Sequence, residues 1–377
     1  HQTGQFKTSA VTVNIITPLD EKASEKALLI HLLARTNKSY PTLTQMNRRL
    51  ASLYGATIYP NAVRMGEAQV LTLTLVSIDE RFALGNEKVL EECIRLLLDC
   101  LFTPDITPDG FKEENMQREK RLLSEKIDSQ NDDKIAYAYK RMLEEMCCDE
   151  AYCISPLGTK EKIATVSGKD VFEIWKKLLL TCPVQINVTG NFDEKGITAV
   201  IEEYFSRLER KESDIIYPRT EFISESYEVK TVREKQKVQQ GKLVIGMRAG
   251  MTDADDNYFA IKVMCDIFGG GVYSKLFNNV REKMSLCYYC SSRPNALKGI
   301  MTIASGIEVE NFEKAKNAIL EQLEALKAGD ISDFEIESAK KSLINGYREL
   351  TDSPAGLVSW YLTRSFVLSG LTVPSSL

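Results

Sequence analysis

The chain has 377 residues, of which 44% are hydrophobic, and its formal net charge is −5. This length predicts two or three domains, each able to bury a full hydrophobic core. Acidic and basic residues are mixed along the chain, and no basic face of the kind that binds phosphates can be identified, so nucleic acid is not an expected partner. No apolar run reaches the roughly 18 residues of a membrane span, and no signal peptide is visible.

The nine cysteines indicate free thiols rather than a disulfide or zinc framework. Cys287 and Cys290 form a CxxC, but a zinc ribbon needs a second such pair, which this sequence lacks. Cys93 and Cys100 lie on an apolar helical face and are interpreted as core residues. We therefore expect a reducing, cytoplasmic location, and we interpret the CxxC as strand packing rather than redox chemistry.

The two halves of the chain repeat the same order of predicted elements. Each begins with an alternating strand and an apolar helix, continues with a basic helix and a strand, and then has an amphipathic helix. The corresponding segments are 11–33 and 242–268, 44–58 and 274–292, and 86–111 and 312–336. Long charged helices are predicted after them, near 109–147 and 332–365. Two repeats of this length indicate a duplicated domain rather than a solenoid.

The predicted fold class is α+β: two homologous domains of mixed sheet with helices packed on one face, related by internal duplication. We place the N-terminal domain at 1–208, a charged linker at 209–225 and the C-terminal domain at 226–377. The second half ends at SGLTVPSSL, before any counterpart of the helix and strand that close the first half. We expect the C-terminal domain to be truncated. Turns with Thr107 and Ser332 are predicted to cap the charged helices.

Three segments in this order resemble the pitrilysin/insulinase family of zinc peptidases. They are GGGVYSKLFNNVREKMSLCYY at 269–289, AYCISPLGTKEKI at 151–163 and VTGNFDEKGITAVIEEYF at 188–205. The branch that is most similar contains the bacterial relatives of mitochondrial processing peptidase, which implies a bacterial protein. The triple glycine at 269–271 lacks the spacing of a phosphate-binding loop and is interpreted as a tight turn with close backbone approach.

Active members of this family carry HxxEH on the first helix of the first domain. Two histidines at i and i+4 share one helical face and can hold one zinc ion, while the glutamate activates the bound water. The stretch KSYPT fixes the register of the resemblance. His31 then takes the second histidine position, Ala27 the first histidine position and Ile30 the position of the general base.

The third zinc ligand in the family is a glutamate on a downstream helix. Our preferred register places Lys126 there, and a shift of one residue would place Glu125 there instead. The family's substrate-binding Asn-Ala is replaced by Ile58 and Tyr59. One histidine without a general base cannot run zinc hydrolysis, so no cofactor is expected in this chain and His31 is interpreted as a core residue.

The second half keeps Arg281 and Tyr288. In active members this pair approaches the zinc site, holds the substrate backbone and stabilises the oxyanion, and both side chains are hydrogen-bond donors suited to that role. Without the resemblance, Arg281 would be a solvated helix charge and Tyr288 a half-buried strand aromatic.

The resemblance implies a catalytically incomplete peptidase homologue. The first hypothesis is that the chain supplies Arg281 and Tyr288 to a heterodimeric metallopeptidase that acts on peptides, with zinc in an HxxEH-bearing paralogous partner. The alternative is a non-enzymatic scaffold or peptide-binding protein, alone or as a homodimer, as in core subunits of respiratory complexes. A self-sufficient zinc peptidase would need a ligand set that the sequence does not show.

Overall fold

A computed structural model describes residues 1–377 apart from residues 86, 227, 253–254 and 368–377. The expected shortening of the second half falls on 368–377 and lies outside the described residues. The contacts divide the chain into two compact units that are not contiguous in sequence. The first contains His1–Asp128, Ile154–Arg219 and Leu350–Ser365, and the second contains Ser129–Cys153, Thr220–Glu349 and Phe366–Leu377.

The first unit is built on a four-stranded sheet in the order β2-β3-β1-β6. Its strands are β1 (Thr8–Pro18), β2 (Thr57–Met65), β3 (Ala68–Ile78) and β6 (Val184–Thr189). In β1, Val11, Val13 and Ile15 alternate with polar residues and enter the hydrophobic core. The intervening Thr12 and Asn14 lie on the other face, where Asn14 accepts a hydrogen bond of 2.8 Å from the Thr72 hydroxyl. The sheet therefore has one apolar and one polar face.

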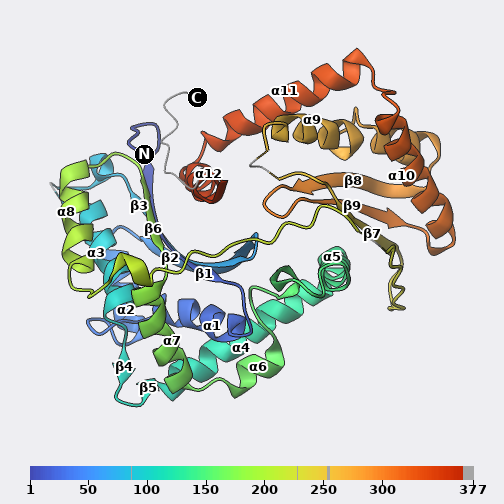
Figure 1. The fold of residues 1–377 in the computed structure, drawn as a ribbon. Helices are drawn as coiled ribbons and strands as arrows, with labels where there is room; N and C mark the ends of the chain where they lie inside the picture. Colours follow the sequence, from blue (N-terminus) through green and yellow to red (C-terminus); the bar gives the residue numbers. More distant parts are fainter. Residues whose placement is uncertain (86, 227, 253–254, 368–377) are drawn as a thin grey trace. The chain divides into compact units, whose positions relative to one another are not determined.

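Helices cover the apolar face of this sheet (Figure 1). They are α1 (Ala23–Leu33), α3 (Val89–Phe102), α7 (Gly168–Thr181) and α8 (Glu194–Phe205), with α2 (Leu43–Ser52), α4 (Glu113–Asp132), α6 (Lys160–Thr165) and the short strands β4 (Ile106–Thr107) and β5 (Gly110–Phe111) around them. Thr42 caps α2 in a capping box with Gln45. The α3 stripe predicted from the sequence is buried from Leu90 to Leu101. The helix is thus held by its apolar face.

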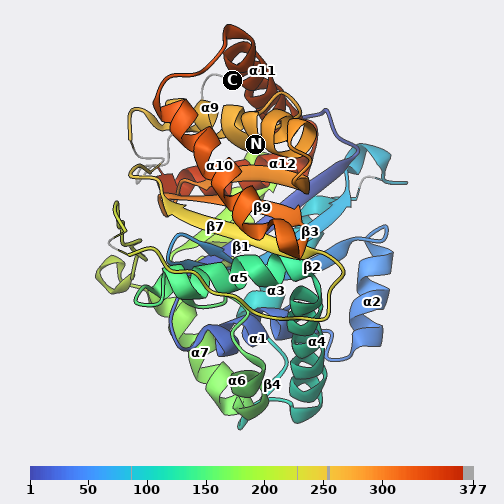
Figure 2. The same ribbon diagram turned by 90° about the vertical axis from the view of Figure 1, so that its right-hand side faces the viewer.

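The second unit is built on a three-stranded sheet in the order β7-β9-β8. Its elements are β7 (Gly241–Arg248), β8 (Cys287–Asn295), β9 (Ile300–Ile307), α5 (Lys134–Met146), α9 (Tyr258–Gly269), α10 (Phe312–Lys327), α11 (Asp333–Leu350) and a π-helix at Leu276–Lys283. Figure 2 shows α9 and α10 on one side of this sheet and α5 on the other. At Gly269 an added Cβ would lie 2.5 Å from the backbone nitrogen of Ser292, which confirms the predicted close approach.

The repeated series of elements run from β1 to α5 and from β7 to α12, and the last helix of each series lies in the compact unit built on the other series' sheet. Helix α5 ends the first series but packs on β7. Helix α12 (Pro354–Val367) ends the second series, but up to Ser365 it belongs to the first unit, where the Ser365 hydroxyl donates to Gln185 of β6 at 3.4 Å. The compact units therefore differ from the predicted ranges 1–208 and 226–377, which remain a proposal about the repeat.

The α+β class is confirmed, but the sheets are antiparallel rather than mixed. The strand pairs in both sheets are antiparallel, and among the described residues the parallel contribution is the isolated bridge between Gln2 and Gly190.

Ser332 caps α11 as predicted, because its hydroxyl accepts from the Glu335 backbone nitrogen. The prediction for Thr107 was wrong, since this residue lies in β4 and α4 begins at Glu113. No described helix has the length and apolar character needed to cross a bilayer.

Candidate functional site

Helix α1 carries the positions that the family resemblance aligns with the zinc motif, namely Ala27, Ile30 and His31. Every one of its residues is buried. Ala27 and Ile30 are fully buried in the core of the first unit, and His31, one turn after Ala27 on the same face, is 8% exposed. An apolar pair thus fills the places of the first histidine and the general base.

His31 is held as a neutral imidazole. Burial is the main cause that lowers its pKa to about 4, and the positive charges of Lys126 and Arg35 add to this effect. Its Nε2 atom is buried and has no hydrogen-bond partner among the described residues. An imidazole that is neutral mainly because it is buried, and that also lies near two positive charges, is a poor position for a further cation.

Helix α4 brings Lys126, and not Glu125, to His31. Lys126 is half-buried, burial lowers its pKa, and its charge acts on the imidazole. Glu125 is exposed and pairs with Arg121 at 2.7 Å on the outer face of the helix. The cluster around His31 therefore contains an ammonium group where the zinc ligand of active relatives would be a carboxylate.

Glu119 is a buried carboxylate near this cluster that the sequence analysis missed. It is fully buried in α4 and forms ion pairs with Arg35 at 3.3 Å and Arg118 at 3.1 Å. Two helical turns separate Glu119 from Lys126, so both lie on the inner face of α4. That spacing, together with the apolar positions around it, is the signal that could have identified it. The positive charge of Arg35 compensates the charge of this carboxylate and also acts on His31.

These residues do not fit a zinc ion. Structural and catalytic zinc sites use three or four histidine, cysteine or carboxylate ligands. Within the part of the chain that the structure describes, no three such side chains come together in a way that could hold a metal.

Arg281 lies in the π-helix that precedes β8. Its side chain is 40% exposed, stacks over the Phe277 ring at 4.6 Å and approaches Glu282 at 3.5 Å. A π-helix is rare and frequently found at functional sites. Because the side chain is 40% exposed, the guanidinium is accessible, and these surface contacts hold it only weakly.

Tyr288 lies at a β-bulge on the edge strand β8. Cys287 pairs with Ile307 and Tyr289 pairs with Gly306, so Tyr288 is the extra residue between them. Its side chain is 56% exposed. The hydroxyl donates to the carboxylate of Glu308, which raises the pKa of Tyr288. Arg281 and Tyr288 thus flank Cys287, and the charge of Arg281 reaches that thiol.

The edge strand of the first unit carries the positions that replace Asn-Ala. Ile58 is half-buried against the core, while Tyr59 is exposed on β2. Pro60 follows and has no backbone N–H to donate to an added strand. A peptide that adds a strand to this sheet beside β2 would lack one ladder hydrogen bond at Pro60.

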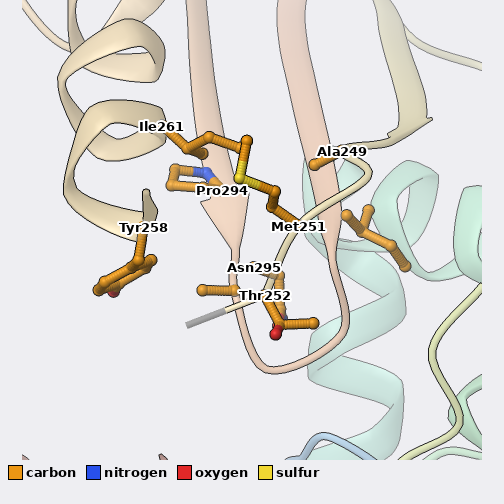
Figure 3. A pocket seen from close by; sticks show the side chains of 9 residues that line it. Ala249, Met251, Thr252, Tyr258, Ile261, Pro294 and Asn295 are labelled. Carbon is orange, nitrogen blue, oxygen red and sulfur yellow. The ribbon is translucent and has the colours of Figure 1, made fainter. Parts of the chain in front are cut away.

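Two cavities of very different size lie in the described part of the chain. The cavity in Figure 3, lined by residues that include Met251, Tyr258 and Pro294, has a volume of about 10 Å³, which is room for one water molecule. A wider cavity of about 430 Å³ lies in the first unit between the start of α1 and α7. None of the residues proposed as functional lines either cavity.

The fold and this cluster define a class of protein: a duplicated α+β chain in which the positions that the resemblance aligns with a zinc motif are occupied by Ala27, Ile30, His31 and Lys126.

The chain belongs to the peptidase M16 family, which corresponds to the pitrilysin/insulinase resemblance. Residues 166–343 match the family description "Peptidase M16 inactive domain". The chain is 33% identical over 357 residues to the "Probable inactive metalloprotease YmfF" of Bacillus subtilis, covering 94% of this chain and 83% of that protein.

Solved structures agree with this assignment. A conserved protein from Enterococcus faecalis V583 superposes with a TM-score of 0.87 at 28% identity and covers 98% of this chain and 87% of its own. A peptidase M16 inactive domain from Pseudomonas fluorescens gives a TM-score of 0.76 at 16% identity over 98% of this chain and 85% of its own, and supports the fold alone.

Proposed function

We propose that this chain is the non-zinc subunit of a heterodimeric metallopeptidase that acts on peptides. In this proposal it supplies Arg281 and Tyr288, and an HxxEH-bearing paralogous partner supplies the zinc ion. The observation that carries the proposal is an asymmetry between the two halves. Ala27 and Ile30 are sealed in the core, whereas Arg281 and Tyr288 are accessible. The relative in Bacillus subtilis is itself named as probably inactive.

The chemistry of the two exposed side chains suits this role. When a peptide bond is attacked, negative charge develops on its carbonyl oxygen, and preorganised donors lower the energy of that state. The guanidinium of Arg281 and the phenol of Tyr288 can both donate there. The phenol now donates to Glu308, so substrate would have to replace that carboxylate as its acceptor.

An extended peptide is the expected substrate class. Exposed sheet edges bind extended chains through main-chain hydrogen bonds, and β8, which carries Tyr288, is an edge strand of its sheet. A cytoplasmic location remains a prediction from the cysteine content.

The test is an affinity pull-down of the full-length tagged chain from its native extract, followed by peptide-cleavage assays on the recovered pair. A stoichiometric partner with HxxEH and bound zinc is expected. Arg281→Ala should then lower kcat by about a hundredfold, the usual effect of removing one oxyanion donor, while the pair stays associated. Arg293→Ala, an exposed arginine further along β8, is the matched control and should leave kcat unchanged.

The second candidate is a scaffold or peptide-binding protein without turnover. It is favoured by the Tyr288–Glu308 contact, which occupies the phenol. A chain that purifies alone or as a homodimer and binds unfolded peptides without cleaving them would support this candidate. Unchanged kcat in Arg281→Ala, in a pair that does cleave, would show that the arginine has no part in catalysis.

A further inference from the structure

The bulge at Tyr288 changes the relation between the two cysteines of the CxxC. In a regular strand, residues i and i+3 point to opposite faces and their α-carbons lie roughly 10 Å apart. Here Cys287 pairs with Ile307 and Cys290 pairs with Ser305. These two partners are separated by a single residue of β9 and therefore share one face. Cys287 and Cys290 consequently also share a face.

The spacing across the bulge is compatible with a disulfide. Two residues of β9 advance by roughly 6.6 Å, and the α-carbons of Cys287 and Cys290 follow that advance. Disulfides join α-carbons that are about 4.4 to 6.8 Å apart. This separation lies within the range, so a disulfide could close across the bulge without a large movement of the backbone.

The surroundings make Cys287 the reactive member of the pair. Cys290 is buried in the core of the second unit, and Cys287 is half-buried at its edge. The neighbouring Cys290 thiol is the main cause that lowers the pKa of Cys287, with further contributions from Ser305 and the charge of Arg281. The same contact raises the pKa of Cys290.

Buried cysteines elsewhere in the chain are in the opposite situation. Burial is the main cause that raises the pKa of Cys93, Cys100, Cys147 and Cys265 to about 12. Their thiols stay protonated at neutral pH and are poor nucleophiles.

We propose that Cys287 and Cys290 form an oxidation site that takes peroxides as its co-reactant. The Cys287 thiolate attacks one oxygen of hydrogen peroxide, the O–O bond breaks, and the products are a sulfenic acid and hydroxide, which takes up the proton that the thiol had lost and leaves as water. The Cys290 sulfur then attacks the sulfenic sulfur and displaces a second water. The two thiols have lost two electrons and two protons, and the peroxide has been reduced to two molecules of water.

The disulfide would enclose Tyr288 in a small ring. Because Tyr288 is the extra residue of the bulge, the bond fixes its backbone and links its position to the redox state. The existence of the oxidation site does not depend on the proposed peptidase role. If both hold, oxidation also lowers turnover of the heterodimer, and that is a separate readout.

The experiment uses the reduced full-length chain, treated with increasing hydrogen peroxide and then blocked with iodoacetamide. Trypsin cleaves after Lys283 and after Lys298 and does not cleave between Arg293 and Pro294, so residues 284–298 are released as one peptide with these two cysteines and no other. The expected product is this peptide with two hydrogens lost and no alkylation. Dithiothreitol should return it to the doubly alkylated form.

Three variants separate this site from general oxidation. With Cys290→Ser, dimedone should trap the sulfenic acid on Cys287, and with Cys287→Ser no bridged peptide should form. Cys148→Ser, which removes an exposed cysteine of the same unit, should leave the bridge unchanged. Without peroxide, iodoacetamide should modify Cys287 at least about tenfold faster than Cys290 at neutral pH, since only the thiolate reacts and the pKa of Cys290 is raised.

The proposal is overturned if the wild-type peptide 284–298 stays doubly alkylated at peroxide doses that oxidise Cys148. It is also overturned if Cys287 is found bonded only to other cysteines. Because the wild-type chain gives the decisive result, poor folding of a variant would not obscure the outcome.

Discussion

His31 shows how one buried side chain makes stability depend on pH. Its pKa is 6.5 in an unfolded chain and about 4 in the fold. Above pH 6.5 both states are neutral and the stabilisation is complete. Between pH 6.5 and 4 the unfolded chain takes up a proton that the fold does not, so stability falls as the pH falls, by at most about 3 kcal/mol.

Replacing His31 by leucine should remove this component. The free energy of unfolding in urea, measured between pH 4 and 7, is expected to fall less steeply on acidification in His31→Leu than in the wild type. His1→Gln is the control, because His1 is the other histidine of the chain and is exposed. An equal slope in wild type and His31→Leu would mean that His31 is solvated.

Lys126 should act on His31 through its charge. Lys126→Gln keeps much of the side-chain volume and removes the ammonium, so the pKa of His31 is expected to rise from about 4, while burial continues to keep it below 6.5. A proton NMR titration of the imidazole would measure the change. Lys120→Gln is the control, since Lys120 is in the same helix and its ammonium contacts the Ala164 carbonyl. Equal titration curves for all three proteins would contradict the placement of Lys126.

At the level of elements, the segment that follows α5 is fixed by a buried charge cluster in the second unit. Glu150, just after α5, accepts from Arg248 of β7 and pairs with Lys298 in the turn between β8 and β9. All three side chains are almost completely buried. Removal of the carboxylate would leave two buried cations without their anion, which costs far more than the net value of the ion pairs.

Glu150→Gln is therefore expected to lower the free energy of unfolding by about 3 kcal/mol. Urea denaturation followed by circular dichroism gives the value. Glu125→Gln is the matched control in an exposed pair and should cost less than about 1 kcal/mol. Similar losses in the two variants would indicate that water reaches the Glu150 cluster.

The long charged segments predicted near 109–147 and 332–365 each form two helices. Asp133 accepts from the backbone nitrogens of Ile135 and Ala136 and starts α5. Pro354 begins α12, at the first helical position that proline favours. Both signals are local and visible in the sequence. They show where each helix starts, but they carry no information on which sheet the new helix will contact.

At the scale of the molecule, α5 and α12 each belong to the compact unit built on the sheet of the other half of the chain. Each half of the chain, cut near residue 219, would have a helix without its sheet and a sheet without its helix. We expect residues 1–219 and 220–377 to be poorly soluble when expressed alone and to form a folded complex when expressed together. Size-exclusion chromatography and circular dichroism would test this. Two stable, separate halves would show that the exchange contributes little.

The sequence by itself determined the α+β class, the duplication, the family and the loss of HxxEH. Each of these follows from local sequence patterns, namely alternating apolar and polar residues, apolar helical stripes, helix caps and ordered motifs. The tertiary structure decided which side chains meet. It placed Lys126 rather than Glu125 at His31, buried Glu119 beside Arg35, exchanged α5 and α12, and turned Cys287 and Cys290 to one face. These four results depend on the rotation of a helix about its axis, on packing between distant segments and on one extra residue in a strand. The hydrophobic periodicity of a sequence carries no information on any of them.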